Sequence, residues 1–177
     1  MLFLLLIDTE EKRSKFEIIY YTYRNLLFYI AMNLLNNDAD AEDAVQETFL
    51  RVITLLDSIS EPSSLKTKHL VVIIVKNISI NMLRHRQVHG KCISIDSLND
   101  EYEDWVADTV IESIPEKLDL LNALKSLPDR YAEVLLLRYH EEYSYTDIAK
   151  IMGITEPYAR KLVQRACDKL RTIMTNT

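Results

Sequence analysis

The amino-acid sequence predicts an all-α protein, in which two small helical domains are joined by an acidic and flexible linker. Its 177 residues include only two glycines and four prolines while 48% are hydrophobic, a composition that favours helices over a turn-rich β architecture. Apolar residues recur at intervals of three and four in both halves of the chain. Between these periodic stretches, residues 96–116 contain eight acidic residues and no lysine or arginine. We therefore expect helical domains at residues 1–90 and 117–177, with the linker at 91–116.

Three long helices are expected in the first domain. The first spans residues 12–36, where apolar and aromatic side chains follow helical spacing. The second is expected to begin at a cap formed by Asp40 and to run to about Asp57. The third runs from about Leu65 to Gln87. Its β-branched centre would also suit a strand, but 14 residues without a turn signal favour a helix.

The opening segment and the cysteines bear on where the protein resides. MLFLLLI is too short to cross a bilayer, and the acidic residues that follow it are the wrong flank for a signal peptide. We expect this segment to form a short arm that packs on the first domain. Cys92 and Cys167 lie far apart, which favours a reducing compartment over a disulfide framework. The sequence therefore predicts a soluble, cytoplasmic protein without membrane insertion.

The segment from Ser144 to Leu170 has the pattern of a helix, a tight turn and a second helix. Gly153 stands where the turn needs a residue without Cβ. Thr155 can cap the second helix, and Pro157 falls in its first turn, where no intrahelical donor is lost. These features predict a helix-turn-helix, a unit whose second helix lies in the major groove of DNA.

The second helix of this unit separates into an apolar side and a polar side. The apolar side is expected to pack on the preceding helix and comprises Ala159, Val163, Ala166 and Leu170. From residue 155 to 172 there are five basic residues against two acids, a surplus suited to DNA phosphates and base edges. The alternative is an ordinary helical hairpin with a solvated charged face. The residues expected to contact DNA here are Thr155, Pro157, Tyr158, Arg160, Lys161, Gln164 and Arg165.

The first domain carries a basic stretch as well. The chain has a net charge of −6, but the eight acids of residues 96–116 account for more than all of it. Residues 66–91 contain six lysines and arginines and no acid, so they can follow a phosphate backbone. The alternative is simple solubilising charge. The candidate DNA contacts in this stretch are Lys66, Lys68, Lys76, Asn77, Asn81, Arg84 and Arg86.

Asp43, Gln46 and Glu47 form a charged stripe on the second expected helix. Periodicity alone favours a solvated face of an amphipathic helix for this stripe.

Catalytic and metal sites are not expected. His85, His89 and Cys92 have a spacing that could suit zinc, but no clear fourth ligand is near and Gly90 interrupts the helix. The sequence has no glycine-rich phosphate loop and no pattern of nucleophile, base and orienting residue. We therefore expect no enzyme activity, no metal and no cofactor.

Three stretches resemble a known family. DAEDAVQETFLRVI, VKNISINMLRHR and LKSLPDRYAEVLLLRYHEEYSYTDIAKIMGIT are similar, in this order, to regions two and four of bacterial sigma factors. The specific resemblance is to the two-domain extracytoplasmic-function (ECF) group of the sigma-70 family, and it extends from about Phe16 to Arg171. It implies a factor that binds core RNA polymerase and directs promoter recognition, DNA melting and transcription initiation.

The resemblance also implies a role for each part. The helix with Asp43, Gln46 and Glu47 corresponds to the surface that docks on the β′ clamp helices of the polymerase. The basic end of the third helix corresponds to the reader of the minus-ten element, and residues 60–68 to the loop that holds an unstacked non-template base. The helix from Thr155 corresponds to the reader of the minus-thirty-five element.

Other partners follow from the same resemblance. The helices at residues 124–139 correspond to those that meet the polymerase β flap, and the acidic linker enters the polymerase near the path of nascent RNA. Members of the family often have an anti-sigma factor that covers both domains.

The chain departs from the family at several positions. A tryptophan often stands at the place of Leu70, an aspartate at Asn81, and basic residues at Leu162, Cys167 and Asp168. We therefore expect an unusual promoter sequence. The rival functions are a two-domain helix-turn-helix regulator that binds an operator as a dimer, and a protein-interaction adaptor.

Overall fold

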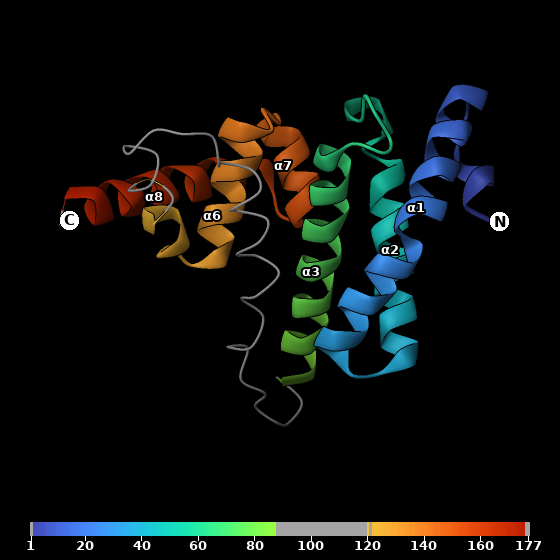
Figure 1. The fold of residues 1–177 in the computed structure, drawn as a ribbon, viewed down its shortest axis with the longest axis horizontal. Helices are drawn as coiled ribbons and strands as arrows, with labels where there is room; N and C mark the ends of the chain where they lie inside the picture. The colour runs from blue at the N-terminus through green and yellow to red at the C-terminus, as the bar shows by residue number, and fades with distance from the viewer. Residues whose placement is uncertain (1, 88–119, 121, 176–177) are drawn as a thin grey trace. The chain divides into compact units, whose positions relative to one another are not determined.

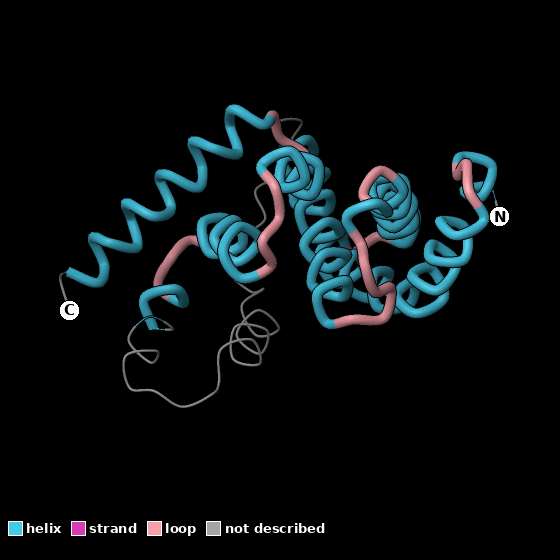
Figure 2. The backbone as a smooth tube through the Cα atoms, turned by 90° about the horizontal axis from the view of Figure 1, so that it is seen from above, coloured by secondary structure: helices cyan, strands magenta, loops and turns pink. Residues whose placement is uncertain are grey.

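The computed structural model describes residues 2–87, 120 and 122–175. Within these ranges every regular element is a helix and there is no strand, as the sequence predicts (Figure 2). The chain divides into two compact units. The expected linker at 91–116 lies outside the described residues, as do His89 and Cys92, whose spacing was considered for zinc and disfavoured.

Three long helices form the N-terminal unit, and each of them packs on the other two (Figure 1). A short 3₁₀ helix precedes them and a second one separates α2 from α3. The elements are η1 (Leu2–Leu6), α1 (Glu10–Leu35), α2 (Asp38–Ile53), η2 (Leu56–Ser58) and α3 (Leu65–Gln87).

The boundary between α1 and α2 differs from the prediction. Asn36 ends α1 in the left-handed conformation, with φ of 48°. Asn37 then adopts an extended conformation, and its side chain accepts a hydrogen bond from the backbone N–H of Asp40. Asp40 was expected to be the cap, and this was wrong, because it already lies in the first turn of α2. The helix also ends at Ile53 and not near Asp57.

Aromatic side chains fill the end of the N-terminal unit where η1 meets α1 and α2. Phe16 and Phe49 are fully buried, and their rings meet edge-on with centroids 5.8 Å apart. The ring of Phe3 lies 5.7 Å from that of Phe16 and 6.2 Å from that of Phe49. The opening segment therefore packs on the domain as an arm, as expected, and adds aromatic contacts to its core.

The β-branched segment of α3 is helical, as predicted, over the expected bounds. Leu70, Ile74 and Ile78 are fully or almost fully buried at helical spacing. Val71 and Val75, one residue further on, are buried too, because both α1 and α2 pack on this helix. Burial on two sides outweighs the weak preference of β-branched residues for strands.

The described part of the chain after residue 119 is assembled from shorter helices. Residues 122–125 are helical, and Leu124 and Leu127 are buried, as expected from their spacing. A single turn of π-helix directly follows α6, and α6 packs on α8. The elements are α6 (Asp129–Leu135), η3 (Leu136–His140), α7 (Tyr145–Met152) and α8 (Glu156–Thr175).

The turn between α7 and α8 has the predicted glycine and proline in the predicted places. Gly153 has φ of 65°, a left-handed conformation that a Cβ would strain. The backbone N–H of Ile154 donates to the carbonyl of Ala149 at 2.9 Å and closes the end of α7. Thr155 stands directly before α8, and Pro157 lies in the first turn, where a missing N–H costs nothing.

None of the helices in the described residues is both long enough and apolar enough to cross a bilayer.

Candidate nucleic-acid interfaces

The polar face of α8 is open to solvent. The sequence predicts seven DNA contacts here, Thr155 directly before the helix and six residues within it up to Arg165, and all seven are exposed. Ala159, Val163 and Ala166 are buried on the other side, as predicted. Leu170, the fourth residue of the expected apolar side, is only half-buried. This face of α8 is therefore open to contact with the major groove of DNA.

Leu162 is 2% exposed, so it belongs to the core. Its side chain is therefore not part of the exposed face of α8.

One tyrosine fixes an arginine of this face. The ring of Tyr145, the first residue of α7, has the guanidinium of Arg138 at 4.6 Å from its centroid and that of Arg160 at 4.5 Å. Arg138 also donates from Nη1 to the carbonyl of Tyr143 at 3.0 Å. Two cations on one ring fix the position of α8 relative to the start of α7.

Glu156 completes this arrangement at the first residue of α8. Its Oε1 accepts from Nη2 of Arg160 at 2.7 Å, and its Oε2 accepts from Oγ1 of Thr146 at 2.9 Å. These two hydrogen bonds, first that of Arg160, lower the pKa of the Glu156 carboxyl. Arg160 is thus oriented by a carboxylate and an aromatic ring before any DNA is bound. Sequence reasoning identified Arg160 but missed Tyr145, Glu156 and Thr146.

The basic stretch of α3 is only partly open. Asn81 and Arg84 are exposed, whereas Lys76 and Asn77 are half-buried. The side-chain amide of Asn77 donates to the carbonyl of Ile73 at 2.9 Å. In the C-terminal half of α3, the open part of this surface therefore lies in the last two turns, on the side of Asn81 and Arg84.

Arg86 is exposed but paired with Asp40 at the start of α2. The pair joins the end of α3 to the beginning of α2. A phosphate would compete with the Asp40 carboxylate for this guanidinium. Use of Arg86 as a minus-ten contact would therefore cost an internal ion pair.

Lys66 and Lys68 lie in the first turn of α3 and are exposed. Ser64 caps this helix, because its Oγ accepts from the backbone N–H of Thr67 at 3.2 Å. The Oγ1 of Thr67 donates to the carbonyl of Glu61 at 2.6 Å. Cap and loop are thus tied together just before the two lysines.

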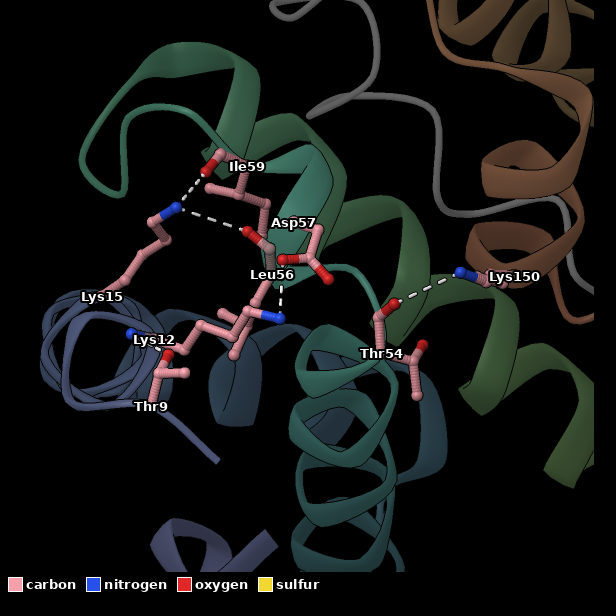
Figure 3. A network of polar contacts seen from close by, with 8 residues as sticks. All are labelled: Thr9, Lys12, Lys15, Thr54, Leu56, Asp57, Ile59 and Lys150. Atoms are coloured by element: carbon pink, nitrogen blue, oxygen red, sulfur yellow. Dashed lines mark hydrogen bonds and ion pairs between the residues drawn. The ribbon is translucent and has the colours of Figure 1, made fainter. Parts of the chain in front are cut away.

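Two lysines of α1 hold the segment between α2 and α3 (Figure 3). Nζ of Lys15 donates to the carbonyls of Ile59 at 2.8 Å and Leu56 at 3.4 Å. Nζ of Lys12 lies 2.6 Å from Oδ1 of Asp57, and this hydrogen bond lowers the pKa of the Asp57 carboxyl. Sequence reasoning missed both lysines.

The charged stripe of α2 faces solvent. Asp43, Gln46 and Glu47 are exposed, while Ala44 and Val45 between them are buried. Glu47 pairs with Arg51, one turn later, at 2.8 Å. The Glu47 side chain is 53% exposed and therefore open to a partner, whereas the Arg51 side chain is only 18% exposed.

Among the described residues no group of three or more His, Cys, Asp or Glu side chains could hold a metal ion.

Comparison with known families identifies both units. Residues 19–89 match the family model for sigma-70 region 2, and residues 117–170 match that for sigma-70 region 4. The matches follow in this order and together cover more than two-thirds of the chain. The chain belongs to the sigma-70 family.

Similar sigma factors belong to the ECF group. The chain is 27% identical over 158 residues to the ECF RNA polymerase sigma factor SigW of Bacillus subtilis, covering 84% of this chain and 83% of that protein. It is also 27% identical over 156 residues to the ECF RNA polymerase sigma factor SigM of the same organism, covering 88% of this chain and 92% of that protein. This sigma factor is therefore a member of the ECF group.

A solved structure is also similar. It is that of the sigma factor RpoE in complex with the anti-sigma factor NepR from Bartonella quintana, at 23% identity over 88% of this chain and 94% of that chain, with a TM-score of 0.37.

Proposed function

We propose that this sigma factor binds core RNA polymerase and directs it to promoters, where it helps to melt the DNA and start transcription. The observation that carries this proposal is the presence of regions 2 and 4 in one chain. Region 4 alone would suit many helix-turn-helix proteins. Region 2 would have no evident purpose in a regulator that only binds duplex DNA, so the operator-binding dimer is not favoured.

The division of labour between the surfaces is part of the proposal. The exposed stripe of Asp43, Gln46 and Glu47 contacts the β′ clamp helices, and the described helices at 122–139 meet the β flap. The open face of α8 binds the minus-thirty-five element in the major groove, where each good bidentate base contact contributes about 1–3 kcal/mol. The basic face of α3 binds the minus-ten element as it opens.

Weak contacts are sufficient for these roles. When polymerase holds both domains, each acts at a high effective concentration, so neither has to bind DNA tightly alone. Melting takes bases out of the stack at a cost of a few kcal/mol. Contacts of the DNA with the basic surface of α3 and with the loop at residues 60–68 offset this cost.

The remaining assignments belong to the same proposal. The domains extend over residues 1–90 and 117–177, joined by the linker at 91–116. The protein acts in the cytoplasm as an initiation factor and not as an enzyme. An anti-sigma factor that covers both domains is a further expected partner.

Promoter-directed transcription with core polymerase of the source organism tests the proposal. The purified protein should confer defined start sites on core enzyme, and start-site mapping after induced expression should identify the same promoters. A protein that binds duplex DNA alone and gives core enzyme no start site would be an operator-binding regulator, contrary to the proposal.

Two sets of substitutions separate the surfaces. Changing Asp43, Gln46 and Glu47 together to Ala should weaken core binding without unfolding the protein. The control is the triple Ala variant of Asp8, Glu11 and Asn33, which is also exposed and removes the same charge. Equal core affinity of the two variants would remove the polymerase-binding assignment.

The second set concerns α8. Lys161→Glu with Arg165→Glu should abolish recognition of the upstream element while core binding stays intact, because both side chains are exposed and far from the stripe in sequence. Retained upstream recognition would contradict the assignment of this face.

A further inference from the structure

The loop between η2 and α3 is held at several points by side chains outside it. It runs from Ile59 to Ser64 and connects the last turn after α2 with the first turn of α3. Backbone carbonyls at both ends of this loop accept hydrogen bonds from residues of α1, which is more than 30 residues earlier in the chain. A short loop fixed at both ends has few conformations left to lose when it binds a ligand.

Lys15 holds the first end of the loop. Its ammonium donates to Ile59 and, at longer distance, to Leu56, so one charge gathers two carbonyls of the turn (Figure 3). Hydrogen bonds with a charged donor are roughly twice as strong as neutral ones. Lys15 is half-buried, which protects these bonds from competition by water.

Tyr23 holds the other end, two turns further along α1. Its hydroxyl donates to the carbonyl of Ser64 at 3.3 Å, and its ring is 4% exposed. Inside the loop, the Glu61 carbonyl accepts from Oγ of Ser64 at 2.9 Å and from Oγ1 of Thr67 at 2.6 Å. The loop is therefore ordered by three separate anchors before it meets any partner.

The surface beside the loop suits an unstacked base. Leu65, the first residue of α3, is 65% exposed, and the exposed Lys66 follows it. An apolar side chain next to a cation offers a platform for the face of a base and a charge for its phosphate. Ser60, Glu61 and Ser63 in the loop are exposed as well and supply polar groups for a base edge.

We propose that Lys15 of α1, helped by Tyr23, is a positioning residue for promoter opening: it keeps the loop Ile59–Ser64 in the shape that receives one unstacked non-template base. This inference rests on the proposed function. Neither side chain touches DNA in this role. Loss of Lys15 leaves the loop free to adopt other conformations. The apparent affinity for the base then falls in proportion to the population of the conformation that receives it.

The experiment uses the full-length protein assembled with core polymerase. The probes are single-stranded non-template oligonucleotides that span the melted element of a promoter found by start-site mapping. In each probe of the series one base is replaced by an abasic residue. With the natural protein, one abasic position should weaken binding far more than its neighbours do.

Lys15→Met keeps the length of the side chain and removes its charge. The penalty at a position is the factor by which an abasic residue there weakens binding. We expect the penalty at that one position to fall about tenfold in Lys15→Met. The affinity for the oligonucleotide that is abasic at that position and the affinity for core polymerase should stay as in the natural protein. Lys15→Arg should restore the penalty. Lys12→Met is the matched control, because it removes the same charge from α1 but breaks only the contact with Asp57, whose side chain is 80% exposed.

Three results would overturn the inference. The first is an unchanged penalty in Lys15→Met, and the second is an equal weakening at every position, which a merely structural role would give. The third is a natural protein that starts transcription from the mapped promoter yet shows no position-specific penalty, an outcome that leaves the proposed function standing.

A second variant covers the possibility that Lys15→Met fails to fold. Tyr23→Phe keeps the buried ring and removes only the donor to Ser64, so it should also reduce the penalty at the same position. A natural pattern of penalties in Tyr23→Phe would then refute the inference. If the natural protein gives no start site at all, the proposed function fails and this inference fails with it.

Discussion

The two guanidinium groups on the ring of Tyr145 make this residue a sensitive point of the helix-turn-helix. Replacing Tyr145 by Leu removes the aromatic faces but keeps an apolar side chain of similar reach. Replacing it by Phe keeps the ring, and therefore serves as the matched control. We expect Tyr145→Leu to lower the stability of the C-terminal domain and its affinity for the upstream element, and Tyr145→Phe to change neither appreciably.

The size of the effect follows from the geometry. Both cations lie within 4.6 Å of the ring centroid, well inside the range of cation–π attraction. Arg138 is half-buried and should contribute about 1 kcal/mol, whereas the Arg160 side chain is 58% exposed and should contribute about 0.5 kcal/mol. A loss of about 1.5 kcal/mol corresponds to roughly a tenfold change in an equilibrium constant. For a domain of this size it should lower the melting temperature by about 5–10 °C.

Two measurements check this expectation. Thermal unfolding of the full chain, followed by circular dichroism, reports the change in melting temperature of the variant. Fluorescence anisotropy of the holoenzyme with a duplex that carries the upstream element reports the role of Arg160, and we expect a loss of about threefold to tenfold. If Tyr145→Leu has the same melting temperature and the same affinity for DNA as Tyr145→Phe, the ring does not position Arg160 and the reasoning is refuted.

Two further predictions concern single groups. The hydroxyl of Ser79 in α3 is fully buried and has no hydrogen-bond partner among the residues that the structure describes. Ser79→Ala should therefore stabilise the protein by about 1 kcal/mol in urea unfolding, and a loss of stability would show that the hydroxyl is satisfied. The pKa of Glu156 is lowered in the folded protein from its ordinary value of 4.5. The ionised carboxylate therefore stabilises the fold at pH values above 4.5, and this stabilisation is lost as the pH falls through the lower pKa of the folded state. The melting temperatures of the natural protein and of Glu156→Gln should therefore differ at pH 6 and converge in acid, whereas a constant difference would contradict the assigned hydrogen bonds.

The features that were predicted from the sequence are local in the chain. The bounds of α3 and the turn at Gly153 follow from periodicity and from residues that few other conformations accept. The exposure of the whole predicted DNA face of α8 follows from the same periodicity, because a helix with one apolar side must leave the other side outside.

The start of α2 shows where local signals become ambiguous. Asn37, Asp38 and Asp40 are all good capping residues and stand within four positions. The left-handed Asn36 decides the choice, since it ends α1 and sets the next residue in the extended conformation that a cap requires. The sequence pattern favoured Asp40, because apart from the asparagine itself nothing in the sequence indicates that residue 36 is left-handed.

The anchors of the loop could not be predicted from the sequence for a different reason. Lys15 binds carbonyls that lie 41 and 44 residues away, and a backbone carbonyl is the same at every position of the chain. In the sequence, Lys12 and Lys15 are ordinary charges on the polar side of an amphipathic helix. Only the packing of α1 against η2 brings these ammonium groups to the turn.

The two surfaces that we assign to DNA share one physical design. Arg160 is oriented by Tyr145 and Glu156, and the loop after η2 is oriented by Lys15, so in each case residues that do not contact DNA set the geometry of those that do. Ordering a side chain or a loop at the moment of binding costs free energy, and a surface ordered during folding does not pay this again. Core polymerase brings both domains close to whatever DNA it binds, whether or not that DNA is a promoter. A fixed geometry of the contacting residues, in contrast, favours only the sequence that matches it. Loss of a positioning residue should therefore reduce the discrimination between promoters more than it reduces the affinity for polymerase.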